Sequence, residues 1–213
     1  MADPALQDFA DSPCAAWLDG PATATDLRLR VEFRHVGDRY AHRVVVVASD
    51  GQIAPALESL EGADGDPWPE SPALQALNRD QLVRAADAGQ ATVAALVGMS
   101  GACHWSLGIE PRSEPAGPGL LFDAACRIKR LPPALGSRYC LAPGAESCAG
   151  LGGEVVVTAA DGRWRLRLAP VADEPLDCTL DGAQLRIRRP VDPATGLPTT
   201  LRWRYAVQLL APE

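Results

Sequence analysis

One segment gathers residues that could do chemistry, reading LVGMSGACHWSLGIE from residue 96 to residue 110. It places Cys103, His104 and Ser106 within four positions of one another. Successive side chains of a strand point to opposite faces, so His104 and Ser106 would share a face that excludes Cys103. A serine beside a histidine could attack an acyl group if a third side chain orients the imidazole ring. Asp123 could be this third side chain if the strands around residues 103–109 and 120–128 pair.

The same segment has a structural interpretation, which we favour. The chain lacks the G-x-S-x-G turn that exposes a nucleophilic serine in many hydrolases. Trp105 then belongs to the core, and His104 makes an ordinary hydrogen bond. We therefore assign no catalytic residue, and the candidates for a hydrolase are His104, Ser106, Asp123 and Cys103.

Two histidines, His35 and His42, fall on the two strands of an expected hairpin, near its turn. Imidazole nitrogens on neighbouring strands could share a metal ion, but a site needs at least one further ligand. The carboxylates that could complete such a site are Glu58, Glu61 and Asp123. The alternative, which we favour, is that the rings close one end of the core, and we expect no metal and no cofactor.

Arginines alternate with apolar residues along several expected strands of the second half. If these strands were neighbours, their guanidinium groups would form a ladder suited to carboxylate or sulfate groups. The alternative is a set of separate pairs with nearby carboxylates. The candidate ligand-binding arginines are Arg163, Arg165, Arg186, Arg188, Arg202 and Arg204.

A further candidate is Trp68, which stands between Pro67 and Pro69 in a segment rich in Gly, Asp and Pro. A tryptophan held in a stiff loop can stack on a sugar ring. It can equally cover one end of the core, and this second role is the one we favour.

The elements that must position these residues are strands. In residues 27–34, LRLRVEFR, apolar and charged residues alternate without error, which predicts a half-buried strand. A turn at Gly37-Asp38 would pair positions that sum to 75, so that Phe33 faces His42 and Val31 faces Val44. We expect Val31 and Phe33 to be buried, and Arg30 and Arg34 to be exposed. Asp-Gly turns at 161–162 and 181–182 predict two more hairpins.

This pattern predicts an all-β fold, an antiparallel sandwich or barrel of about ten strands with at most one short helix. Residues 71–89 fit a helix or a strand with a turn equally well. We expect a loose N-terminal arm at 1–25, a main β domain at 26–148, and a hairpin-rich part at 154–213 on the same sandwich.

The formal net charge of −7 is uneven, because residues 1–110 carry −9 and residues 111–213 carry +2. Acidic chains bind poorly to nucleic acid and to anionic membranes, so neither is an expected partner. Residues 1–25 lack a basic and apolar leader pattern, so we expect a soluble cytoplasmic protein. Because the cytoplasm is reducing, we expect the six cysteines to be mostly free thiols. We expect at most one disulfide, and Cys140 and Cys148 are the best candidates for it.

Three phrases resemble those of a group of uncharacterised bacterial proteins. The chain has GMSGACHWS at 98–106, FDAACR at 122–127 and DPWPESPALQ at 66–75. They are similar to the group's G-M-x-G-x-x-H-W-S, F-D-x-A-C-R and D-x-W-P-x-S-P-x-L-Q. The resemblance covers roughly residues 27–140, and it implies no activity or catalytic residue, because the group has no assigned activity.

The function that we expect is a β-sandwich binding or scaffold protein that is not an enzyme. Its partner would be an unknown protein or an acidic carbohydrate. The alternatives are a hydrolase that uses His104 with Ser106 or Cys103, and a metal-binding protein that uses His35 and His42.

Overall fold

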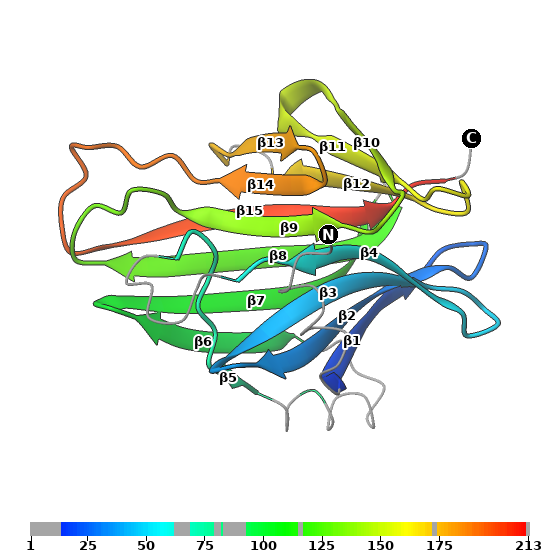
Figure 1. The fold of residues 1–213 in the computed structure, drawn as a ribbon, viewed down its shortest axis with the longest axis horizontal. Helices are drawn as coiled ribbons and strands as arrows, with labels where there is room; N and C mark the ends of the chain where they lie inside the picture. The colour runs from blue at the N-terminus through cyan, green and yellow to red at the C-terminus, as the bar shows by residue number, and fades with distance from the viewer. Residues whose placement is uncertain are drawn as a thin grey trace.

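The computed structural model describes residues 14–61, 69–78, 82, 93–114, 117–171 and 174–211. These residues form two antiparallel sheets that pack face to face, with the core between them (Figure 1). The all-β fold expected from the sequence is confirmed, and the architecture is the sandwich. The helical positions among the described residues are Leu82 and a short 3₁₀ turn, Leu151–Gly153, between β10 and β11.

The first sheet has seven strands among the described residues. In spatial order they are β1 (Cys14–Ala22), β2 (Arg28–Val36), β3 (Arg39–Val47), β4 (Ile53–Ser59), β9 (Gly136–Leu141), β14 (Gln184–Arg188) and β13 (Asp177–Asp181).

The second sheet has eight strands in the same part of the chain. In spatial order they are β10 (Glu146–Ala149), β11 (Val155–Thr158), β12 (Arg165–Pro170), β15 (Thr199–Leu209), β8 (Gly117–Ile128), β7 (Cys103–Glu114), β6 (Ala94–Ser100) and β5 (Ala76–Leu77).

The β2–β3 hairpin has the register predicted from its sequence. Phe33 faces His42 and Val31 faces Val44, and both Phe33 and Val31 are fully buried. Arg30, expected to be exposed, is half-buried, and so is Arg34. Arg30 donates from Nε to Asp19 Oδ1 over 2.6 Å and lies 5.3 Å from the ring of Trp17. The neighbouring strand β1 thus covers a face that the hairpin alone would leave open.

Residues 14–22 of the expected loose arm form this strand β1, while residues 1–13 lie outside the described residues. The segment CAAWLDGPA has no clean alternation, because small residues, Gly and Pro dilute it. It pairs with β2 through two register shifts, a sign of bulges. Tertiary pairing therefore decided its conformation. Of the residues 71–89, for which helix and strand were equally expected, the described part contains both β5 and the helical residue Leu82.

The two halves of the chain share both sheets. Strand β14 pairs with β9 in one sheet, and β15 pairs with β8 along ten residue pairs in the other. The hairpin-rich part at 154–213 therefore lies in the same sandwich as the rest of the chain. The return of β15 to the middle of its sheet is visible in Figure 1 as a red strand between β8 and β12.

Aromatic rings fill the centre of the core. The rings of Phe122 and Tyr205 stack with centroids 5.1 Å apart, and Trp105 meets Trp203 edge-on at 6.2 Å. All four side chains are among the largest fully buried ones of the described residues.

Strand β6 approaches the segment before β5 so closely that residue 98 must be glycine. A methyl group on Gly98 would overlap the carbonyl oxygen of Ala73, which is main chain and cannot rotate away. Gln75 adds to this contact by bonding the main chain of Met99 through both amide atoms, over 2.6 and 2.8 Å.

We predict that Gly98→Ala lowers the free energy of unfolding by about 1–3 kcal/mol, the usual cost of overpacking. The measurement is urea denaturation followed by circular dichroism. Gly108→Ala, on the adjacent strand β7, is the matched control, since its methyl group would find neighbours only at 3.9–4.0 Å. It should be neutral or stabilising by up to about 1 kcal/mol. Equal losses for the two variants would contradict the argument.

Candidate functional site

The residues proposed for hydrolysis lie on the outer face of the eight-stranded sheet. His104 and Ser106 are exposed there, and Cys103 points into the core, as the alternation predicted. Asp123 lies opposite Gly108, whereas His104 lies opposite Arg127, four residues along β8 from Asp123. Because a strand rises ~3.3 Å per residue, His104 and Asp123 are about 13 Å apart along the strand direction.

The carboxylate of Asp123 is engaged elsewhere. Both of its oxygens accept hydrogen bonds from Arg202 on the neighbouring strand β15. Asp123 therefore orients a guanidinium group rather than His104, and the structure does not bring the three residues together. The arrangement lacks the base–orienter contact that nucleophilic catalysis by Ser106 requires.

Cys103 has the environment of a structural thiol. It is buried beside Cys126, and burial raises the pKa of both thiols. A thiol with a raised pKa stays protonated and is a poor nucleophile. All six cysteines are unbridged, and Cys140 and Cys148 lie on strands of different sheets.

The two histidines of the expected metal site have different surroundings. His35 is exposed and meets the ring of Tyr40 edge-on at 5.0 Å. His42 is buried, and its Nε2 atom is 2.9 Å from the Tyr139 hydroxyl group. Within the described ranges, no group of three or more His, Cys, Asp or Glu side chains could hold a metal ion.

The six candidate arginines do not line up as one ladder. Arg186 and Arg188 lie on β14 of the seven-stranded sheet, three lie on strands of the other sheet, and Arg163 lies in the turn before β12. On the other sheet, Arg165 lies beside Leu210 and Arg204 beside Val171, at opposite ends of the β12–β15 pair. Ion pairs between described residues within 4 Å include Arg163–Asp161, Arg186–Asp181, Arg188–Glu70, Arg202–Asp123 and Arg204–Glu174. Trp68, the other ligand-binding candidate, lies outside the described residues.

A polar cluster that the sequence did not reveal lies in the core between the sheets. The Tyr139 hydroxyl group contacts both His42 and, over 2.6 Å, the Tyr205 hydroxyl group. Beside it, Ser59 accepts a hydrogen bond from the His42 amide and donates one to Glu61 over 2.6 Å. The tyrosines occupy inward positions that predict only core packing, so no sequence pattern indicated the cluster.

Two atoms of this cluster are buried without a hydrogen-bond partner among the described residues, His42 Nδ1 and Glu61 Oε2. Both residues line a cavity of about 10 Å³, the space of roughly one water molecule. Burial lowers the pKa of His42 to about 4 and raises that of Glu61 to about 7, where Ser59 and Arg39 oppose the increase. At pH 6 the folded protein therefore holds a neutral imidazole and a protonated carboxyl group.

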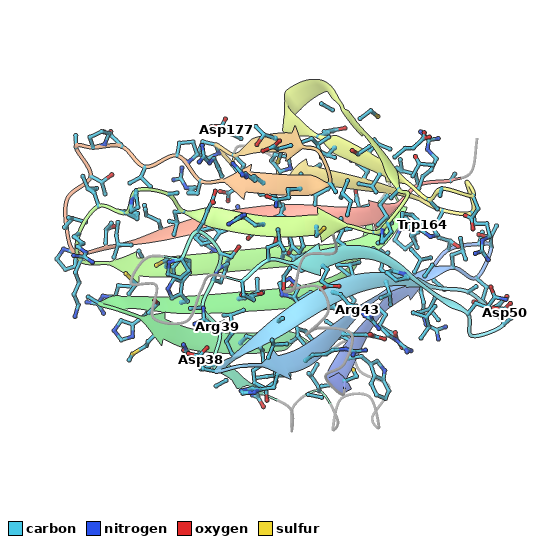
Figure 2. The ribbon with its side chains drawn as sticks, viewed as in Figure 1. Asp38, Arg39, Arg43, Asp50, Trp164 and Asp177 are labelled. Carbon is cyan, nitrogen blue, oxygen red and sulfur yellow. The ribbon has the colours of Figure 1, made fainter. Side chains whose placement is uncertain are left out.

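A large concave site among the described residues lies at one end of the sandwich (Figure 2). Its volume is about 550 Å³, within the range of small-molecule sites. The walls come from the β1–β2 turn, the start of β8, the start of β12 and the end of β15. We call this cavity the end pocket. The described residues that line it are Thr23, Ala24, Thr25, Leu27, Gly117, Pro118, Gly162, Arg163, Trp164, Arg165, Leu209, Leu210 and Ala211.

Trp164 stands at this end of the sandwich, as Figure 2 shows. Its side chain is only 7% exposed, and together with Leu27 and Leu209 it gives the end pocket an apolar wall. A smaller hollow of about 80 Å³ adjoins it and shares Leu27, Arg163 and Trp164. The sequence indicated Arg163 and Arg165 as binding residues but did not indicate the pocket, because its walls come from four separated segments.

The chain matches no family model, no curated protein and no solved structure. The resemblance to the group of bacterial proteins therefore stays a prediction. Among the described residues, no helix has the length and apolar character needed to cross a membrane.

We predict opposite pH dependences from Glu61 and His42. The pKa of Glu61 is higher in the folded protein, about 7, than its ordinary value of 4.5, so its stabilising contribution is complete below pH 4.5 and is lost as the pH rises to about 7. The pKa of His42 is lower in the folded protein, so its contribution is complete above pH 6.5 and is lost as the pH falls to about 4. The two effects offset each other between about pH 4.5 and 6.5.

Glu61→Gln removes the contribution of Glu61 to the pH dependence of stability and leaves that of His42. The unfolding free energy of the variant minus that of the wild type should rise by up to about 1.4 kcal/mol per pH unit between pH 4.5 and 7. Urea denaturation at a series of pH values measures it. Ser59→Ala keeps the carboxyl group of Glu61 but removes the hydrogen-bond donor that lowers the pKa of that group. In this variant the pH range over which the unfolding free energy falls should therefore extend above pH 7. If the difference in unfolding free energy between Glu61→Gln and the wild type does not change from pH 5 to 8, the prediction is wrong.

Proposed function

We propose that this protein is a non-enzymatic binding protein that holds a small, largely apolar ligand in the end pocket. The observation that supports the proposal most is the apolar wall of Leu27, Trp164 and Leu209 around a space of about 550 Å³. Small-molecule sites are typically concave and apolar with a few polar groups, and here Thr23, Thr25 and the two arginines are the polar ones.

The geometry supports this function better than the two alternatives. For hydrolysis, the candidate serine and histidine are exposed on an outer sheet face, and the aspartate is held by Arg202. For metal binding, His42 is buried against Tyr139 while His35 is exposed. An acidic carbohydrate bound along an arginine ladder is also less well supported, because the arginines are split between sheets and paired with carboxylates.

The test is binding of N-phenyl-1-naphthylamine, a neutral apolar fluorophore whose emission rises in apolar surroundings. We predict saturable binding that Ala24→Trp weakens by roughly tenfold or more, because an indole ring at this exposed turn position would fill the pocket mouth. Ala194→Trp is the matched control, since Ala194 is also an exposed loop residue but does not line the end pocket. Equal binding by the two variants would refute the proposed site.

A further inference from the structure

Among the described residues that line the end pocket, the ionisable side chains are two arginines. Thirteen residues of the described chain line it, and those with a charge are Arg163 and Arg165. This is unusual in a chain whose formal net charge is −7 and which has 27 acidic residues. A site whose charged groups have one sign favours a ligand of the opposite sign.

Arg163 is fixed in place at the rim. Its Nε atom donates to Asp161 Oδ2 over 2.6 Å, and its Nη1 atom donates to Gln52 Oε1 over 3.1 Å. The side chain is nevertheless 64% exposed, so an approaching ligand can reach it. A guanidinium group has five N–H donors in one plane, which allows it to bind more than one oxyanion at a time.

Apolar surface lies on both sides of this guanidinium group. Arg163, Leu27 and Trp164 line both the end pocket and the smaller adjoining hollow, so they lie where the two meet. The hollow adds Val46 and Ile53, and Ile53 is 46% exposed. A ligand whose charged end lies at Arg163 would therefore have its apolar part against Trp164 and Leu27.

We propose, on the basis of the proposed function, that the ligand is a single-chain amphiphile with a carboxylate head, such as a medium-chain fatty acid. The carboxylate binds Arg163 at the rim, and the hydrocarbon chain lies in the end pocket against Leu27, Trp164 and Leu209. Asp161 competes with the ligand for the same guanidinium group, because it already accepts the hydrogen bond from Nε.

The experiment compares three ten-carbon compounds as competitors of N-phenyl-1-naphthylamine, each below its micelle concentration. They are decanoate, decanol and decyltrimethylammonium, which share a chain and differ in head-group charge. For the wild-type protein, decanoate should displace the fluorophore at roughly tenfold lower concentration than the cation. Arg163→Gln should weaken decanoate by roughly fivefold and leave decanol unchanged. Asp161→Asn should strengthen decanoate, since the amide keeps the oxygen that caps the turn but loses the charge.

Arg188→Gln is the matched control. Arg188 is also an exposed arginine beside a carboxylate, but it lies on β14 of the other sheet and does not line the end pocket. It should leave all three displacement curves unchanged. If the fluorophore binds but the three compounds displace it equally, the carboxylate inference is overturned while the proposed function stands. If the fluorophore does not bind at all, the proposed function fails, and the inference fails with it.

Discussion

Side-chain hydrogen bonds between described residues cross the interior and join the sheets of the sandwich. Tyr139 of β9 meets Tyr205 of β15 through their hydroxyl groups, and Trp203 Nε1 donates to Ser137 Oγ over 3.1 Å. A buried polar group without a partner costs about 1–3 kcal/mol, so the sheets are most stable in the alignment that satisfies both pairs. Apolar packing alone is non-directional and would allow the sheets to slide. The polar contacts therefore specify one arrangement of an otherwise apolar core.

The end pocket lies away from these central contacts, at one end of the sandwich (Figure 2). Strands of packed sheets cross at an angle that follows from their twist, so the corners of two sheets separate even when their centres are in contact. At one corner the β1–β2 turn meets the start of β12, and the space between them is the end pocket. Trp164 and Leu27 continue the core to its edge and thus line an apolar site.

Ion pairs organise the outer faces. Arg202 holds Asp123, Arg204 holds Glu174, and Arg43 holds Glu32 across neighbouring strands or loops. Exposed ion pairs contribute little stability, but in these three the carboxylates are largely buried, and they balance arginines that would otherwise repel across strands. They also explain why an arginine-rich sheet need not be an anion-binding surface.

The sequence by itself determined the strands whose side chains alternate strictly, and with them the all-β class. The β2–β3 register followed from LRLRVEFR and one two-residue turn, because a slip by one residue would place charges in the core. Weakly patterned strands such as β1, β4 and β9 were not predicted, since their conformation depends on pairing partners far away in the chain. The same holds for function. Local spacing brought His104 and Ser106 onto one face, but only tertiary structure decided that Asp123 bonds Arg202, that His42 is enclosed beside Tyr139, and that four distant segments surround a pocket. Contacts between residues distant in the chain are set by the packing of whole sheets, which spacing along the chain does not encode.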